Sequence, residues 1–267
     1  NNNAHYNENG ERIIYIAIRR PDGYVGKPAV VGTDVFNMVT GNSSSVIPTY
    51  VSGFPVDWAL QRKPDSSFNW DAVSRLTGTK YLQTNNTNAE SNYNPYTWDS
   101  NTGWAKDGGC DSTFQSWMWK RHAGFDVVNY SGQSGSKTVP HSLNAVPEMM
   151  WVKNRTYDDA NGWTVYHKGL NGGTNPEQYR MRLQSTTGED DNNLAWNDTA
   201  PTSTHFTLGT DRMVNQGSYN YIAMLFASVD GISKVGYYTG NGSTQTITTG
   251  FSPRFAIIRR TDGSEDH

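Results

Sequence analysis

The sequence lacks the features that define several large protein classes. Its single cysteine, Cys110, excludes an internal disulfide framework among the 267 residues. Its longest apolar runs, Ile13–Ile18 and Ile222–Ala227, are far too short to cross a bilayer as a helix. The formal net charge is −3 and the pI is near 6.1, so no basic surface predicts binding to nucleic acid or to an anionic membrane.

Long stripes of apolar residues at helical spacing are also absent, which argues against a helical bundle. Only 35% of the residues are hydrophobic, but the chain contains 9 Trp, 15 Tyr and 9 Phe among many Asn, Gly, Ser and Thr residues. Because each aromatic side chain buries a large area, a few of them can fill a thin core. This mixture predicts an all-β protein with aromatic cores and long polar loops.

A repeated pattern organises the chain. A Gly-containing turn is followed by a proline that opens an apolar run, at Pro55, Pro147 and Pro253, which lie 92 and 106 residues apart. A period of this length indicates a small domain rather than one turn of a solenoid. Both faces of each run are apolar, so each is predicted to be a strand that packs on both sides, as at a domain junction.

Each unit can be read as a series of strands. In the third unit we expect strands at Lys234–Thr239, Thr244–Thr248 and Phe255–Ile258. The two longer units have six to eight candidate strands in about 100 residues, which is the density of a β-sandwich. We therefore predict an all-β chain of tandem β-sandwich repeats of about 100 residues, each of jelly-roll or immunoglobulin-like size.

The repeat boundaries predict four segments and favour an excerpt of a longer polypeptide. Residues around Ile13–Ile18 resemble the last strand of the second unit at Gly217–Met224. A last strand and a half-copy each lack a complete sheet, so we expect them to pair with each other or with another polypeptide. The segments are 1–30 (end of a preceding repeat), 31–123 and 124–231 (complete repeats) and 232–267 (start of an incomplete third repeat).

The loop between Tyr93 and Trp104 is the best candidate for ligand binding. Its aromatic rings lie among polar residues, and such rings can stack on sugar faces. Trp98 matches Trp196 of the next unit and is therefore predicted to fill a core. Tyr96 and Trp104 are the rings that we expect to be exposed and to contact a glycan.

Arginine closes each apolar run, which suggests a shared structural role. A guanidinium at a strand end can form paired hydrogen bonds with a carboxylate of a neighbouring domain. We predict contacts between modules or subunits at Arg20, Arg62, Arg155 and Arg260.

The sequence offers no catalytic or metal-binding pattern. Asp57 and Asp65 have no evident acidic counterparts in the other units, and no serine elbow is present. The histidines lack the spacing of metal ligands, and the acidic loop at Gly188–Asn193 lacks that of an EF-hand. We predict no catalytic residue, no metal and no cofactor.

Six segments of the chain carry a likeness to a known family: Ile16–Pro28, Trp117–Asp126, Asn144–Lys153, Val165–Leu170, Trp196–Thr202 and Tyr219–Ala223. They resemble an uncharacterised repeat domain of long virion proteins of marine bacteriophages, including cyanophages and pelagiphages. The resemblance implies a component of the phage particle, from the tail region or a fibre, and provides no catalytic residues to carry over.

Together these observations predict a non-enzymatic structural protein of the extracellular phage particle. Its expected partners are other virion subunits, including copies of itself, without nucleic-acid binding or membrane insertion. Two alternatives remain open: a carbohydrate-binding adhesin that attaches the particle to a host surface glycan, and a polysaccharide depolymerase.

Overall fold

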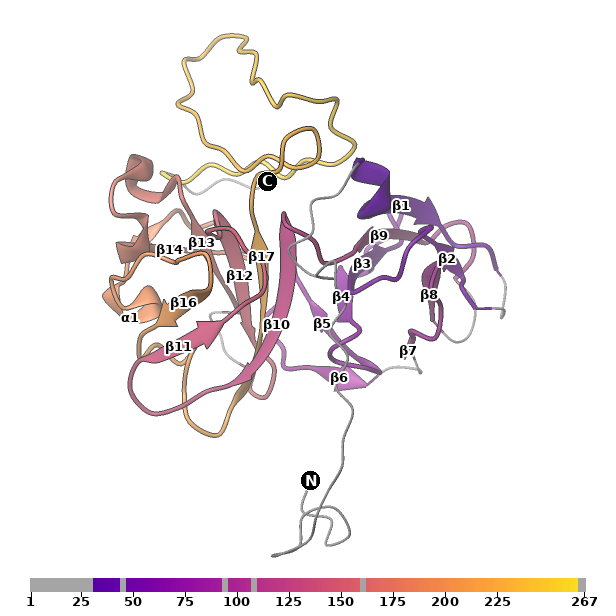
Figure 1. The fold of residues 1–267 in the computed structure, drawn as a ribbon, viewed down its shortest axis with the longest axis horizontal. Coiled ribbons are helices and arrows are strands. Elements are labelled where there is room, and N and C mark those ends of the chain that lie inside the picture. Colours follow the sequence, from indigo (N-terminus) through magenta and orange to yellow (C-terminus); the bar gives the residue numbers. More distant parts are fainter. Residues whose placement is uncertain (1–30, 44–46, 93–95, 107–109, 159–161, 264–267) are drawn as a thin grey trace, which may run out of the picture.

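The computed structural model describes residues 31–43, 47–92, 96–106, 110–158 and 162–263. Every sheet in these residues is antiparallel, so the prediction of an all-β fold is confirmed (Figure 1). The described helices are single short turns: η2 (Gly32–Asp34), η3 (Leu170–Gly173), η4 (Pro176–Gln178) and α1 (Asn193–Trp196).

The first large sheet has six strands in the order β1-β9-β3-β4-β5-β6. A three-stranded sheet of order β2-β8-β7 comes from the loops between these strands. The strands are β1 (Phe36–Thr40), β2 (Tyr50–Val51), β3 (Trp58–Arg62), β4 (Asp71–Ser74), β5 (Lys80–Gln83), β6 (Ser91–Asn92), β7 (Tyr96–Thr97), β8 (Gly103–Lys106) and β9 (Gln115–Trp119).

The second large sheet also has six strands, in the order β10-β17-β12-β13-β14-β15. The pair β11-β16 forms a separate two-stranded sheet. The strands are β10 (Phe125–Ser131), β11 (Lys137–Pro140), β12 (Met149–Asn154), β13 (Trp163–His167), β14 (Tyr179–Arg182), β15 (Asp190–Asp191), β16 (His205–Leu208) and β17 (Asn220–Phe226).

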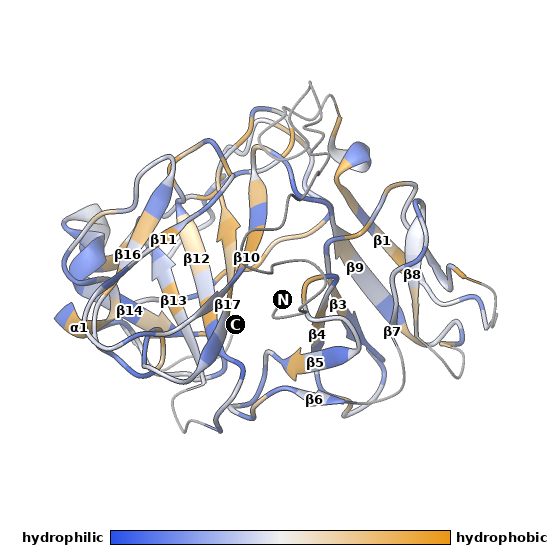
Figure 2. Ribbon diagram, turned by 60° about the horizontal axis from the view of Figure 1, so that its bottom comes forward, coloured by the Kyte–Doolittle hydropathy of each residue, from blue (hydrophilic) through white to orange (hydrophobic). Residues whose placement is uncertain are grey.

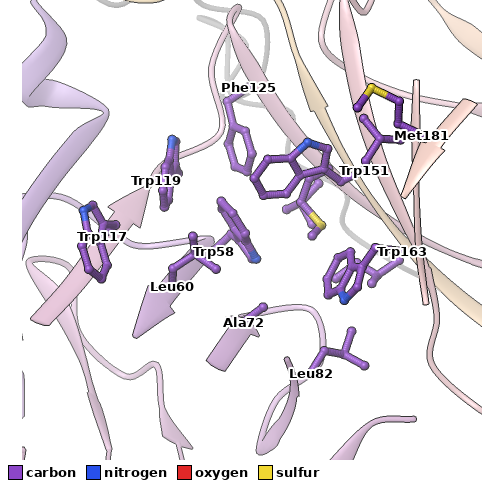
Figure 3. Packing of buried hydrophobic residues seen from close by; sticks show 14 of the residues in the cluster. Trp58, Leu60, Ala72, Leu82, Trp117, Trp119, Phe125, Trp151, Trp163 and Met181 are labelled. Carbon is purple, nitrogen blue, oxygen red and sulfur yellow. The ribbon is translucent and has the colours of Figure 1, made fainter. Parts of the chain in front are cut away.

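Three apolar clusters hold these sheets together. The inter-sheet cluster combines residues of both large sheets, including Trp58, Trp119, Phe125 and Trp151 (Figure 3). The first-sheet cluster lies between the first large sheet and the β2-β8-β7 sheet, and the second-sheet cluster lies between the second large sheet and the β11-β16 pair. Hydrophobic residues colour strands such as β1, β10 and β17, whereas the loops are mostly polar (Figure 2).

Side-chain alternation explains how one strand serves two clusters. In β3, Trp58 and Leu60 enter the inter-sheet cluster, while Ala59 enters the first-sheet cluster. In β12, Trp151 enters the inter-sheet cluster and Val152 enters the second-sheet cluster. Successive side chains of a strand point to opposite faces, so these continuous apolar runs are buried on both sides, in agreement with the sequence interpretation.

The strands expected in the third unit are not formed. Described residues 234–263 contain no strand, and this segment runs as an irregular loop over both large sheets, drawn in yellow in Figure 1. Lys234–Thr239, Thr244–Thr248 and Phe255–Ile258 are therefore corrected to loop. The physical reason is the absence of a partner, since no strand of the described residues lies beside them to accept their backbone hydrogen bonds. The last-strand segment predicted within residues 1–30 lies outside the described residues.

Candidate assembly interface

Trp58 lies at the centre of the contact between the two large sheets. Its ring centroid is 4.5 Å from that of Trp119 in its own sheet. Across the contact it is 5.7 Å from Phe125, 5.9 Å from Trp151 and 6.4 Å from Phe226. Trp58 is tilted against Trp119, stacked on Phe125 and edge to face with Trp151 and Phe226. Such arrangements of aromatic rings stabilise the contact beyond the area that they bury.

The contact leaves little empty space. A small pocket between Trp58, Ala72, Trp163, Ile222 and Met224 has room for about one water molecule. Because the pocket is narrow and mostly apolar, it does not resemble a ligand site, which typically needs several hundred Å³. The interface is therefore packed like a protein interior.

A group of charged side chains lies at one edge of this apolar contact. Glu90, just before β6, binds Arg155, just after β12, with 2.7 Å between Oε2 and Nε. The backbone N–H of Glu90 also donates to the carbonyl oxygen of Arg155 at 2.9 Å. Lys80 adds a second cation, 3.2 Å from the other oxygen of Glu90. Both Glu90 and Arg155 are largely shielded from solvent, so the pair is screened less than a surface ion pair.

Three further hydrogen bonds link residues 76–87 with the second large sheet. The indole N–H of Trp163 donates to the carbonyl oxygen of Gln83 at 2.8 Å. The ammonium group of Lys153 donates to the carbonyl oxygen of Thr87 at 3.0 Å, and Asn129 Nδ2 donates to that of Leu76 at 2.9 Å. These side chains bind backbone groups, so they fix the position of one sheet relative to the other.

The C-terminal segment, residues 234–263, contacts both large sheets. The ring of Phe255 packs 5.8 Å from Phe36 of β1 and 5.6 Å from Trp119 of β9. Arg259 Nη1 donates to the carbonyl oxygen of Arg182 at 2.8 Å, and Arg259 Nη2 donates to that of Thr187 at 2.6 Å. One short segment thus contacts the first large sheet through a ring and the second through a guanidinium.

The structure places the four predicted arginines in different environments. Arg155 forms the pair with Glu90 described above, across the two large sheets. Arg62 instead lies over the ring of Trp70, 5.0 Å from its centroid, and donates to the carbonyl oxygen of Ser66, so its described contacts are local. Arg260 is exposed and pairs with Asp262 two residues later. Arg20 lies outside the described residues.

The expectation that Tyr96 and Trp104 are exposed is wrong. Their exposed fractions are 3% and 0%, and both rings belong to the first-sheet cluster. Trp104 stacks on Tyr50 with centroids 5.0 Å apart, and its indole N–H donates to Ser116 Oγ at 3.1 Å. Both rings lie between the β2-β8-β7 sheet and the first large sheet, so neither ring is accessible to a sugar. The predicted glycan contact at these two residues is corrected accordingly.

Two acids, the buried Asp57 and the partly buried Glu148, bind backbone groups at strand ends. Asp57 precedes β3, and its Oδ2 accepts the backbone N–H of Arg121 at 2.8 Å. Glu148 precedes β12, and its Oε2 accepts the backbone N–H of Ser228 at 2.6 Å. Each acid also has a cationic side-chain partner, Arg121 or Lys168. Asp57 and Glu148 therefore occupy corresponding places, which the sequence alone did not reveal. Asp57 follows Pro55 by two residues, whereas Glu148 follows Pro147 by one.

Two histidines serve as backbone acceptors. Nδ1 of His122 accepts the N–H of Gly124 at 3.0 Å, and Nδ1 of His167 accepts that of Gly169 at 2.9 Å. Burial, with a smaller effect of Lys120, lowers the pKa of His122 to about 4. Burial, with a smaller effect of the adjacent lysine, also lowers the pKa of His167 to about 4. Both rings are therefore neutral at pH 7, with Nδ1 free of a proton to accept these bonds.

Within the described ranges, no group of three or more His, Cys, Asp or Glu side chains is arranged to hold a metal ion. The described helices are all too short and polar to traverse a bilayer. The one cysteine, Cys110, is buried, and its sulfur accepts a hydrogen bond from Gln61 Nε2.

Comparison with known proteins places the chain in a family. No curated protein and no solved structure matches it at a level that shows a relationship. Residues 66–267 match a family described as a domain of unknown function, DUF7483. The match starts after β3, includes the rest of both large sheets and extends through the C-terminal segment that contacts them. This protein belongs to the DUF7483 family.

Proposed function

We propose that this protein is a non-enzymatic structural component of a phage particle, from the tail region or a fibre, built from consecutive β-sandwich modules. Residues 31–123 form the first module and residues 124–231 the second. The observation that carries the proposal is that the two large sheets have matching strand orders and share one buried aromatic contact.

The correspondence of the strands supports two copies of one module. In both large sheets the first strand of the unit lies at one edge, the last strand lies next to it, and the third strand comes next. The small sheets arise at corresponding places along the chain. The corresponding pairs are β1 and β10, β2 and β11, β3 and β12, β4 and β13, β5 and β14, β6 and β15, β8 and β16, and β9 and β17.

The glycines that follow the first strands correspond as well. The N–H of Gly41 donates to the carbonyl oxygen of Phe114 at 2.9 Å, and the N–H of Gly132 donates to that of Tyr219 at 2.8 Å. Each bond joins the end of the first strand to the start of the last strand. Asp57 before β3 and Glu148 before β12 form a second matched pair. They lie at the other end of the last strands, β9 and β17.

The edge strands are protected in the same way. Asn37 Oδ1 accepts the N–H of Met38 at 2.9 Å in β1, and Asp126 Oδ1 accepts the N–H of Val127 at 2.8 Å in β10. A side chain that satisfies an edge N–H prevents uncontrolled pairing with another strand. The strand order, the contacts at the strand ends and the protection of the edges therefore all support the same correspondence between the two units.

The buried junction suits a rigid assembly. Two modules joined only by a linker would move independently, whereas these share an aromatic core and a shielded ion pair. Asp57 and Glu148 bind backbone groups at strand ends, which favours a structural rather than a catalytic use. With Tyr96 and Trp104 buried, the adhesin alternative loses the residues on which it depended.

Immunogold electron microscopy tests the proposal. Antibodies against this chain should label purified particles of the phage that encodes it, at a tail or fibre position. A chain found in infected cells but not on particles would overturn the proposal. A glycan array with the purified chain provides the parallel test of the adhesin alternative, for which we expect no specific binding.

A further inference from the structure

The C-terminal segment leaves the apolar residues of two predicted strands exposed. Ile258 is 64% exposed, and Tyr237 and Tyr238 are exposed as well. These residues lie in the ranges 234–239 and 255–258, where the sequence predicts the first and third strands of the third unit. Neighbouring exposed apolar residues of this kind usually mark a contact surface.

The backbone of this segment also lacks the partners of a strand. Among the residues that the structure describes, residues 236–258 form no hydrogen bond between two backbone groups. Their described polar contacts are local, since Gln245 Nε2 donates to the carbonyl oxygen of Thr239 and Thr249 Oγ1 donates to that of Phe251. A segment with the side chains of a strand and without backbone partners can accept a further strand, which supplies the hydrogen bonds of the ladder.

The two large sheets show what lies beside the first and third strands of a unit. In each sheet the last strand lies between them and pairs with both: β9 lies between β1 and β3, and β17 lies between β10 and β12. In the third unit the equivalent residues are 234–239 and 255–258, and no described strand pairs with either range. Since β9 and β17 are each bound on both sides, neither can also serve the third unit.

We propose that residues 234–239 and 255–258 form an acceptor for one extended strand of a partner protein, which binds both ranges through its backbone. The proposal rests on the proposed architecture of two matching modules. Every strand of the described residues already belongs to a sheet. A second copy of the chain therefore offers no spare strand from those residues, which favours a different protein as the partner.

The strands β9 and β17 indicate the chemistry of the partner strand. Four consecutive residues of β9 and five of β17 are buried, so both faces of each strand are covered. Neither strand contains a charged residue. The partner strand is therefore expected to be uncharged and apolar on both faces over at least four residues.

Existing contacts hold both parts of the acceptor against the two large sheets. Near the first part, the N–H of Val235 donates to Ser228 Oγ, just after β17, at 3.0 Å. In the second part, the ring of Phe255 packs 5.6 Å from that of Trp119 in β9. The segment lies over both large sheets (Figure 1). A strand bound there attaches the partner protein close to the contact between the sheets, as a component of a larger assembly requires.

Peptide binding tests the acceptor. The probe is a fluorescein-labelled peptide with the sequence of residues 219–226, followed by a short lysine tail for solubility, and fluorescence anisotropy measures its binding to the purified chain. We expect saturable binding that Ile258→Asp weakens about tenfold or more, because a carboxylate then faces the apolar strand. The matched control is Ile247→Asp, at another exposed isoleucine of the segment that lies outside the acceptor, and it should leave the affinity unchanged.

A proline-containing peptide tests whether binding uses the backbone. The same probe with Ala223→Pro should not bind, because proline cannot donate a hydrogen bond in the middle of a ladder. Absence of binding by the original probe, or equal binding by the two probes, would overturn the proposal.

Hydrogen exchange shows where the probe binds. Backbone amides of residues 234–239 and 255–258 should exchange rapidly in the purified chain and more slowly with the probe, whereas those of residues 244–249 should not change. Slow exchange before the probe is added would show that the chain itself or a second copy already occupies the acceptor, and would overturn the proposal. Immunogold labelling tests the location on the particle and the glycine substitutions in the Discussion test the matching modules, so these proposals can fail separately from this one.

Discussion

The indole rings of Trp58 and Trp151 meet edge to face, with centroids 5.9 Å apart and an interplanar angle of 81°. One ring comes from the first large sheet and the other from the second. Both occupy the central part of their sheets, on strands that are buried on both faces. The stability of each sheet therefore depends on the other, and the chain should unfold as one unit.

Trp58→Ala should lower the free energy of unfolding by about 3–5 kcal/mol, because it removes a buried ring and leaves a cavity between the sheets. Urea denaturation followed by circular dichroism measures this loss. The control is Trp70→Ala, which removes a partly exposed ring and should cost clearly less. Equal losses for the two variants would contradict the central role of Trp58.

The ion pair of Glu90 and Arg155 should contribute measurably to the contact between the two large sheets. A double-mutant cycle with Glu90→Ala and Arg155→Ala should give a coupling energy of about 1 kcal/mol, since both side chains are largely shielded. The same cycle on Arg260 and Asp262 should give no measurable coupling, because that pair is exposed. A coupling near zero at Glu90 and Arg155 would show that the pair does not stabilise the junction.

Gly41→Ala and Gly132→Ala should destabilise the protein by similar amounts, of about 1–3 kcal/mol. A Cβ atom on Gly41 would lie 2.0 Å from the carbonyl oxygen of Cys110, and one on Gly132 would lie 2.0 Å from that of Gln216. Thermal unfolding of both variants measures the effect. Gly32→Ala is the control, since a Cβ atom there meets nothing within 4 Å. A large effect at only one of the two sites would argue against the equivalence of the modules.

The free energy of unfolding should decrease as the pH is lowered, because His122 and His167 titrate. Each pKa is about 4 in the folded protein and about 6.5 when unfolded, so only the unfolded state takes up the proton between these values. The contribution of the neutral rings is complete above pH 6.5 and is lost as the pH falls to 4, by up to about 3 kcal/mol per histidine.

Urea midpoints between pH 7.5 and 4 measure this dependence. The double variant with Asn at both positions keeps a side-chain acceptor but does not titrate, so its stability should fall less over that range. Carboxylates titrate equally in both proteins and cancel in the comparison. Parallel curves for the two proteins would contradict the assignment to these histidines.

Much of the local structure could be predicted from the sequence. The apolar runs after Pro55 and Pro147 are strands buried on both faces, because an unbroken apolar run is stable only where both sides are covered. Trp98 and Trp196 are both buried, as their matching positions suggested.

Other properties depended on contacts between distant residues. Tyr96 and Trp104 are surrounded by polar neighbours in the sequence, yet the small sheet folds them into the core. Local composition does not determine whether such a loop lies in solvent or covers a sheet. Residues 234–263 have the pattern of strands, but a strand forms only where another supplies its hydrogen bonds.

The amino-acid order alone determined the all-β class and the residues able to form cores, since side-chain alternation and aromatic content are local properties. It also contained the acids before β3 and β12, although their equivalence was hidden by a one-residue difference in spacing. Only the tertiary structure decided that the two large sheets pack on each other through Trp58 and that Glu90 meets Arg155. The physical reason is that these contacts join residues about 65 or more positions apart, and their energies arise from burial and geometry that exist only in the folded chain.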